Sequence, residues 1–228
     1  MASSSDLMVG VLFIFIILIA VIALLKKQQD ASVAATIKRN GDPRGFVTER
    51  IGRAIQQVSA DTVVDPATGV ISFPEKILFP LGRSSLSEEG VSALAQISAQ
   101  LEANLRCFVA NTYKRPECES INPDRHTVET IFIEGHTDSI PFAVGTGDNF
   151  RLSLDRARAV DAQLVQQSGL REYRNESGQP IFSFSAYADS RPRSGLEPRD
   201  PRNRRVDLRI VLTYRRIDQV VPGLALTE

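Results

Sequence analysis

The sequence predicts a mixed α/β domain behind a single N-terminal transmembrane helix. Residues 7–25 form an uncharged, largely apolar run, and at about 1.5 Å per residue a helix of that length spans the hydrocarbon core of a bilayer. Residues 131–133 are β-branched or aromatic, as in a buried strand, whereas residues 151–167 carry apolar side chains at helical spacing. Because strands and amphipathic helices both occur in the later part of the chain, we expect a mixed sheet with helices on one face.

Composition argues against several classes of protein. The 228 residues allow one or two domains, and a hydrophobic content of 43% is enough for a globular core. A formal net charge of zero argues against a nucleic-acid-binding protein, which usually carries a basic excess. His126 and His136 have no cluster of metal ligands around them, and neither a nucleophile–base pair nor a nucleotide-binding glycine loop is recognisable. We therefore expect no enzyme activity, no metal and no cofactor.

The apolar run is interpreted as an uncleaved membrane anchor. A cleaved signal peptide is the main alternative, but residues 1–6 contain no Lys or Arg where a signal peptide has its basic region. Lys26 and Lys27 follow the run, and the positive-inside rule would place them in the cytoplasm. Residues 28–45 are polar and contain glycine and proline, which predicts a juxtamembrane linker.

The next elements are a helix, a hairpin and a second helix. Residues 46–58 have apolar side chains at helical spacing and predict a short helix. Residues 62–65 and 70–73 flank the turn signal Pro66-Ala67-Thr68-Gly69 and predict a hairpin. Ser87, followed by two glutamates, predicts the start of a further helix.

Two more strand-like segments are separated by an arginine-rich loop. Residues 181–187 read as a strand, and residues 206–212 alternate apolar with charged side chains, as in a half-buried strand. The arginines within residues 199–205 could form a ligand-facing patch. The alternative is a solvated face whose arginines pair with Asp200 and Asp207.

The strand at residues 131–133 and the helix at 151–167 define a candidate site. Asp138 lies just past the strand, and Arg156 lies about two turns into the helix. If the helix packs back along the strand, a carboxylate and a guanidinium flank one shallow pocket, which would suit a zwitterion such as an amino acid. Spacing alone leaves the alternative that both are ordinary surface charges.

Three motifs in this region carry a resemblance to a known family. The motifs are Gly135-His136-Thr137-Asp138, Asn149-x-x-Leu152-Ser153-x-x-Arg156-Ala157 and Asn203-Arg204-Arg205-Val206. Together they resemble the OmpA-like peptidoglycan-binding domain, and the resemblance covers roughly residues 63–214. The resemblance implies an OmpA-like α/β sandwich. It also implies that Asp138 and Arg156 hold the ammonium and carboxylate of diaminopimelate in the cell-wall peptide. The expected peptidoglycan-binding residues are Asp138, Asn149, Leu152 and Arg156.

A domain that binds the cell wall must lie outside the cytoplasm, and this bears on the cysteines. Cys107 and Cys118 bracket a polar insertion and could be two unrelated buried thiols. In an oxidising compartment, two cysteines that close one loop favour a disulfide. The same placement outweighs Lys26 and Lys27, so we expect a single-pass inner-membrane protein with a cytoplasmic N-terminus and a periplasmic C-terminal domain.

Asp6 stands at the start of the apolar run. It could cap the helix, or it could be an ionisable group that carries protons within the membrane. Asp6-Leu7-Met8-x-x-x-x-Phe13-x-Phe15 resembles the ion-carrying helix of MotB-type subunits. One such helix, a linker and an OmpA-like domain in one chain match the MotB layout, so Asp6 is the candidate ion carrier.

The resemblance implies the B subunit of a proton-driven inner-membrane motor. In this family two B subunits thread through a ring of five polytopic MotA-like A subunits. Residues 62–73 and the cell-wall motif look closer to the B subunit of the Zorya anti-phage defence system than to flagellar MotB, whose plug helix is not recognisable. A flagellar stator subunit, a passive membrane-to-wall tether and a wall hydrolase remain alternatives.

The expected organisation has four parts. Residues 1–27 are the short cytoplasmic tail and transmembrane helix, and residues 28–61 are the linker and short helix. Residues 62–216 are the OmpA-like domain, and residues 217–228 are a loose tail.

Overall fold

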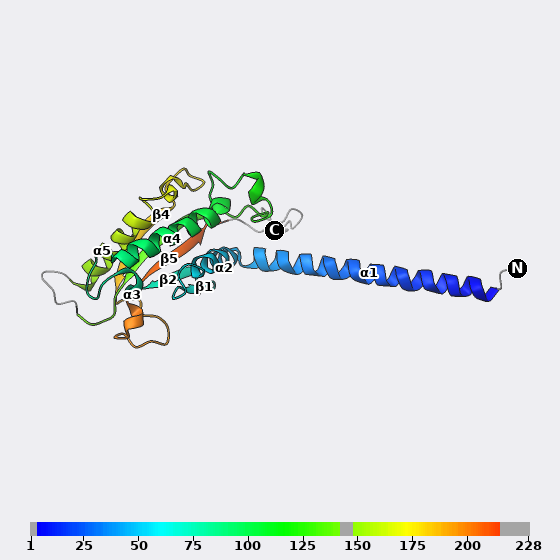
Figure 1. Cartoon of the computed structure of the whole chain (residues 1–228), viewed down its shortest axis with the longest axis horizontal. Coiled ribbons are helices and arrows are strands. Elements are labelled where there is room, and N and C mark those ends of the chain that lie inside the picture. Colours follow the sequence, from blue (N-terminus) through cyan, green and yellow to red (C-terminus); the bar gives the residue numbers. More distant parts are fainter. Residues whose placement is uncertain (1–3, 142–147, 215–228) are drawn as a thin grey trace, which may run out of the picture. The chain divides into compact units, whose positions relative to one another are not determined.

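A computed structural model describes residues 4–141 and 148–214 of the chain (Figure 1). The tail expected at residues 217–228 lies outside this part. The chain divides into two compact units, Met1–Asp42 and Pro43–Glu228. Each unit is described by itself.

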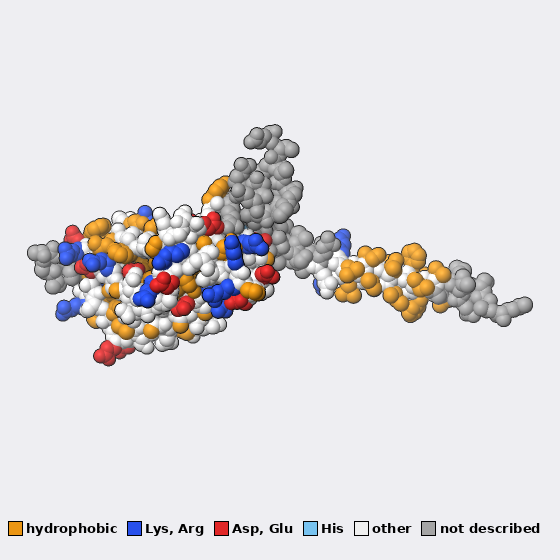
Figure 2. All heavy atoms as spheres, turned by 90° about the horizontal axis from the view of Figure 1, so that it is seen from above, with side chains coloured by type: hydrophobic (Ala, Val, Ile, Leu, Met, Phe, Trp, Pro, Cys, Tyr) orange, Lys and Arg blue, Asp and Glu red, His pale blue; other side chains and the backbone are white. Residues whose placement is uncertain are grey.

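The first unit is built on one long helix, α1 (Ser4–Gly41). Its segment Val11–Gln28 is long and apolar enough to cross a membrane, and none of that segment is buried against the protein. Figure 2 shows the hydrophobic side chains of this helix as a continuous band. The expected apolar helix is therefore present, and the backbone remains helical through Gly41, where the sequence predicted a polar linker.

The second unit contains a five-stranded mixed sheet with the strand order β1-β2-β5-β3-β4. Strands β3 and β4 are parallel, and all other neighbouring strands in this sheet are antiparallel. The strands are β1 (Val63–Asp65), β2 (Val70–Pro74), β3 (Val128–His136), β4 (Phe182–Ala188) and β5 (Arg205–Leu212). The predicted hairpin is confirmed as β1–β2, and the predicted strands near residues 131, 181 and 206 are confirmed as β3, β4 and β5.

Helices cover one face of this sheet, which confirms the predicted fold class. The longer ones are α2 (Pro43–Gln56), α4 (Glu88–Leu105) and α5 (Asn149–Leu164). The short ones are α3 (Glu75–Leu78), η1 (Arg106–Phe108), η2 (Pro116–Cys118), η3 (Gly169–Glu172) and η4 (Pro201–Asn203). Ser87 caps α4 as predicted, because its Oγ accepts a hydrogen bond of 2.9 Å from the Gly90 amide.

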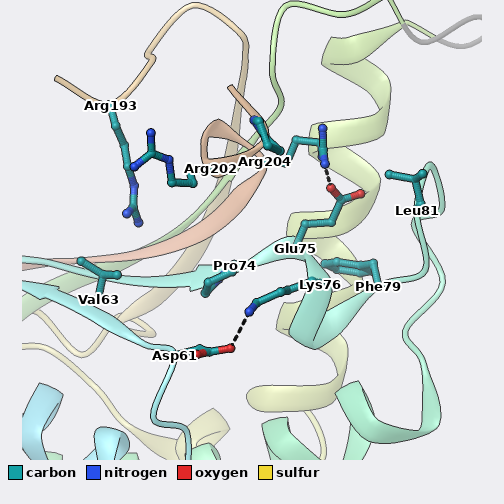
Figure 3. A pocket seen from close by; sticks show the side chains of 11 residues that line it. Asp61, Val63, Pro74, Glu75, Lys76, Phe79, Leu81, Arg193, Arg202 and Arg204 are labelled. Carbon is teal, nitrogen blue, oxygen red and sulfur yellow. Dashed lines mark hydrogen bonds and ion pairs between the residues drawn. The ribbon is translucent and has the colours of Figure 1, made fainter. Parts of the chain in front are cut away.

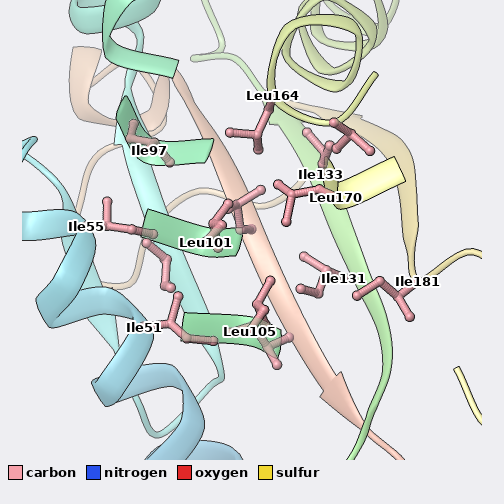
Figure 4. Close-up of a cluster of buried hydrophobic side chains, with 14 of the residues drawn as sticks. Ile51, Ile55, Ile97, Leu101, Leu105, Ile131, Ile133, Leu164, Leu170 and Ile181 are labelled. Carbon is pink, nitrogen blue, oxygen red and sulfur yellow. The ribbon is translucent and has the colours of Figure 1, made fainter. Parts of the chain in front are cut away.

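The hydrophobic core lies between the helices and the sheet (Figure 4). Ile51 and Ile55 of α2, Leu101 of α4 and Ile131 of β3 are all fully or almost fully buried there. Helix α2 thus contributes to the same core as the sheet, and the second compact unit, which begins at Pro43, includes it. Along β5, Leu208 faces this core while its neighbours on either side face away, as the alternating pattern predicts.

The insertion after α4 is closed by a disulfide between Cys107 and Cys118, whose Cα atoms lie 5.1 Å apart. This confirms the predicted pairing. Both cysteines are buried, and Asn122, which follows the insertion, donates hydrogen bonds to the Cys107 and His126 carbonyl oxygens. The insertion is therefore a folded part of the domain.

Candidate functional site

The candidate site lies where β3 ends and α5 begins. Strand β3 ends at His136, and Thr137 and Asp138 follow it. The Asp148 carboxylate caps α5, accepting a hydrogen bond of 2.7 Å from the Arg151 amide. Helix α5 then packs so closely on β3 that a Cβ on Gly135 would lie 2.0 Å from the Ser153 carbonyl oxygen. Glycine permits this approach, which carries Arg156 back beside the strand end.

A cavity of about 320 Å³ opens at this point. All four predicted peptidoglycan-binding residues line it, namely Asp138, Asn149, Leu152 and Arg156. Two further charged residues, Glu75 and Arg204, line it as well. The sequence therefore located the cavity, and the structure adds two charged groups to its wall.

Asp138 and Arg156 are linked through Glu75 and Arg204 in a chain of four charges. The Arg156 guanidinium pairs through Nη2 with Glu75 Oε1, and the other Glu75 oxygen, Oε2, accepts from Arg204 Nε. Arg204 Nη1 then donates to Asp138 Oδ2 at 2.6 Å. Each charge has an opposite charge beside it, which offsets the cost of removing these groups from water.

Arg156 is held rigidly and keeps one donor free. Its side chain is 1% exposed, Nε donates to the Arg83 carbonyl oxygen at 2.9 Å, and the guanidinium lies 5.3 Å from the centre of the Phe79 ring. Burial lowers the pKa of Arg156 from its ordinary value, while the Glu75 carboxylate acts in the opposite direction. An arginine nevertheless stays charged in proteins. Its Nη1 is buried without a hydrogen-bond partner within the described ranges, so this nitrogen still has donor capacity to offer.

Asp138 and Asn149 together shape the turn beside the cavity. Asp138 Oδ1 accepts from the Ile140 amide at 3.2 Å. Asn149 Nδ2 donates to the carbonyl oxygens of Asp138 and Ile140, both at 3.1 Å. Asn149 therefore positions the acidic turn, and the nearly buried Leu152 supplies an apolar wall.

A second charged cluster lies near the end of β3, on the sheet face away from the core. Glu134, His136 and Asp207 are buried, and one possible metal-ligating atom of each lies within 4.8 Å of the others. The expectation that His136 has no such residues around it was therefore wrong, because β3 and β5 bring Glu134 and Asp207 together from distant parts of the sequence. Burial pushes the pKa of Glu134 upward, but the nearby His136 imidazole and the hydrogen-bonded Arg209 guanidinium outweigh it, and the pKa is lowered. The pKa of Asp207 is lowered in the same way, against burial, by His136 and Arg205. Arg205 and Arg209 supply positive charge that compensates the two carboxylates. The His136 ring also stacks on the Tyr187 ring, with 5.5 Å between the ring centres.

The arginines of the arginine-rich loop differ in their surroundings. The exposed Arg202 pairs with Asp200 at 2.7 Å, as expected for a solvated face. Arg205 pairs with Asp207 at 2.9 Å as expected, but both side chains are buried, so this pair is not part of a solvated face. Arg204 instead lines the cavity. Glu75 was not predicted, because a four-residue helix such as α3 leaves no periodic pattern in the sequence.

Comparison with known protein families decides what kind of domain this is. Residues 118–205 match the model of the OmpA family. The chain carries an OmpA-like domain. The match contains the four predicted site residues and Arg204, whereas Glu75 lies outside it.

Solved structures similar to the chain include a cell wall anchor and two proteins described as MotB or MotB-like. The cell wall anchor of the T6SS from Pseudomonas aeruginosa is 22% identical, with 71% of this chain and 96% of that one covered and a TM-score of 0.48. A putative MotB-like protein from Desulfovibrio vulgaris is 17% identical, with coverages of 72% and 93% and a TM-score of 0.44. The periplasmic domain of Helicobacter pylori MotB is 21% identical, with coverages of 61% and 70% and a TM-score of 0.39. No curated protein matches the chain.

Proposed function

We propose that the OmpA-like domain binds the diaminopimelate-containing peptide of peptidoglycan and so anchors a membrane helix to the cell wall. The observation that carries the proposal is that Asp138 and Arg156 line one cavity within a segment matching the OmpA family. A zwitterionic amino-acid head group would place its ammonium against Asp138. Its carboxylate would accept from Arg156 Nη1, which has no other acceptor among the residues that the structure describes.

The four-charge chain supports binding by holding both recognition groups in place before the ligand arrives. Glu75 and the Arg83 carbonyl oxygen fix the Arg156 guanidinium, and Arg204 fixes the Asp138 carboxylate. Binding of a ligand then costs less free energy, because the side chains of the site are already ordered. Retention of the detergent-solubilised full-length protein on purified sacculi tests the proposal, and loss of retention is expected when Arg156 is changed.

We propose anchoring rather than hydrolysis of the wall. The cavity wall of described residues combines ion-paired side chains with apolar ones and contains no histidine that could activate a nucleophile. Incubation of the protein with purified peptidoglycan should therefore release no soluble fragments.

We further infer that the chain is the MotB-like B subunit of a proton-driven motor in the inner membrane, with Asp6 as its ion carrier. The support is the combination of one membrane-length apolar helix with an OmpA-like domain, together with the resemblance of residues 6–15 to the MotB ion-carrying helix. Asp6 belongs to the first described turn of α1, and its side chain lies outside the described part. The partners would be a pentameric MotA-like A subunit and a second copy of this chain.

The resemblance of residues 62–73 favours a motor of the Zorya anti-phage defence type over a flagellar stator. A passive tether is the second candidate function, because a membrane helix and a wall-binding domain suffice for it. Genes for an A subunit beside helicase or nuclease genes would support the defence motor. Flagellar genes in that position would support a stator, and a tether would tolerate Asp6→Asn.

A further inference from the structure

A second and larger cavity, of about 660 Å³, adjoins the candidate peptidoglycan site (Figure 3). Glu75, Leu81 and Arg204 line both cavities, so the two share a wall. On the strand side, Figure 3 shows Val63 of β1 and Pro74 of β2. The opposite side is formed by Arg193, Arg202 and other residues of the loop before β5.

Some of the cationic side chains around this second cavity have an ion-pair partner, and one of them has none within the part of the chain that the structure describes. Lys76 pairs with Asp61 at 2.8 Å, and Arg202 pairs with Asp200. The Arg193 guanidinium, in contrast, makes no hydrogen bond or ion pair with any described residue, although its backbone amide donates to Asn203. Burial lowers the pKa of Arg193 from its ordinary value, with Asp207 opposing that change. Arg193 is thus a half-buried cation that lacks a directly bonded anion.

The rest of the wall is apolar. Pro74 and the nearly buried Phe79 line it, together with Val63 and Leu81, which are 45% and 79% exposed. Exposed apolar side chains around a concave surface are typical of a binding site rather than of an ordinary solvated face. A ligand that fits must therefore combine an anionic group for Arg193 with small apolar groups.

We propose that this cavity is a second subsite for the same cell-wall peptide, in which Arg193 binds a carboxylate adjacent to the diaminopimelate. The proposal rests on the proposed peptidoglycan-binding function. In peptides of that type a glutamate with a free carboxylate precedes the diaminopimelate, and alanines flank the pair. A peptide that places diaminopimelate against Asp138 and Arg156 would pass over Arg204 and Glu75, which line both cavities. Its glutamate carboxylate would then reach Arg193. Its alanine methyl groups would contact Val63 and Leu81.

The test compares two ligands of different length on the full-length protein in detergent. Free meso-diaminopimelate fills only the first cavity, whereas the disaccharide tetrapeptide of diaminopimelate-type peptidoglycan is long enough to reach both. Arg193→Gln should weaken binding of the disaccharide tetrapeptide about tenfold and change diaminopimelate binding by less than about twofold in titration calorimetry. Arg193→Lys should restore part of the loss, because it keeps the charge.

Two further variants separate the subsite from general effects of charge or folding. Arg199→Gln removes the same charge from the same loop, at an exposed residue that does not line the cavity, and should bind both ligands as the parent protein does. Val63→Phe adds bulk at an exposed site on the cavity wall and should weaken only the longer ligand.

The outcomes distinguish this proposal from the one on which it rests. If the parent protein binds neither ligand, the peptidoglycan-binding function itself is wrong. If it binds both, and Arg193→Gln binds the disaccharide tetrapeptide as tightly as the parent does, only the second subsite is wrong. An equal loss of both ligands in Arg193→Gln would also overturn the subsite, because Arg193 would then act through the first cavity.

Discussion

The Glu75 carboxylate pairs with the Arg156 guanidinium although 81 residues separate them in the sequence. Glu75 also accepts from Arg204, so one carboxylate holds two of the cations that line the candidate site. Side chains of Arg156 and Glu75 are both nearly inaccessible to water. Removing either partner would leave a buried charge uncompensated, so the pair bears on the stability of the fold as well as on the shape of the cavity.

Replacing Glu75 tests this double role. Glu75→Gln leaves a buried guanidinium without its counter-charge, and losing one partner of a buried pair costs on the order of 3 kcal/mol. We expect the free energy of unfolding to fall by about that amount in denaturant titrations, with weaker retention on sacculi. Glu172→Gln, which removes half of an exposed pair with Arg171, is the control and should change stability by less than about 1 kcal/mol. Equal effects of the two changes would contradict the role assigned to Glu75.

Arg156 is the residue on which the proposed binding depends. Arg156→Ala should abolish retention on purified sacculi, because an unpaired ligand carboxylate costs on the order of 2–5 kcal/mol, or roughly thirtyfold or more in affinity. Arg156→Lys keeps the charge but lacks the planar guanidinium, which can donate two parallel hydrogen bonds to a carboxylate. This variant should remain folded and bind sacculi weakly. The matched control on the same helix is Arg151→Ala, whose side chain is 76% exposed. Undiminished retention by folded Arg156 variants would refute the proposed site.

The sequence located Asp138 and Arg156 because a strand, a loop and the following helix are close along the chain. Glu75 could not be found in the same way, and Arg204 was expected only as part of a possible ligand-facing patch within residues 199–205. They meet because β2 and β5 pair antiparallel with Pro74 opposite Arg205, which lets the Glu75 amide donate to the Arg204 carbonyl oxygen at 3.0 Å. Strand register over such a separation depends on the packing of the whole sheet, and no local pattern near Glu75 encodes it.

The same distinction between local and long-range features explains which other parts of the fold could be predicted from the sequence. Residues 46–58 showed a helical pattern, but only packing against α4 and the sheet makes α2 part of the folded unit. The disulfide could be predicted because the two cysteines close a short loop, so that their pairing requires no knowledge of the sheet.

The disulfide gives a prediction about stability. Closing a loop of this size stabilises a fold by about 3 kcal/mol in the chain-entropy account. The Cys107→Ser, Cys118→Ser double variant should therefore unfold at lower denaturant concentration than the parent. Mass spectrometry of unreduced peptides from natively exported protein should show the two cysteines linked. Two alkylatable thiols in that material would contradict the bond and weaken the periplasmic placement.

The charged cluster of Glu134, His136 and Asp207 predicts a loss of stability in acid. The pKa values of Glu134 and Asp207 are both lowered by folding, so the folded protein binds fewer protons than the unfolded chain in the range just below their ordinary values of 4.5 and 3.8. Their contribution is present above that range and is lost as the pH falls through the lowered pKa values. Denaturant titrations between about pH 6 and pH 3 should show this decline. In Glu134→Gln the slope with pH should be shallower, and an unchanged slope would exclude Glu134 as a cause.

Asp6 decides between a motor and a tether. A carboxylate that takes up a proton and releases it alternates between neutral and charged forms, and this alternation changes how its helix packs against surrounding subunits. Asparagine has nearly the same shape but does not titrate. Asp6→Asn should therefore preserve expression, membrane insertion, co-purification with the A subunit and retention on sacculi, while biological activity is lost.

Asp6→Glu provides the matched comparison, because it keeps the titratable group and moves it by about one methylene. We expect partial activity from this variant in a phage-protection or motility assay, whichever the neighbouring genes indicate. Full activity of Asp6→Asn would refute the motor and leave the passive tether, since a tether needs only the helix and the wall-binding domain. If Asp6→Asn lost activity and co-purification together while Asp6→Glu kept both, the carboxylate would be needed for assembly. The ion-carrier role would then be rejected in favour of a structural one.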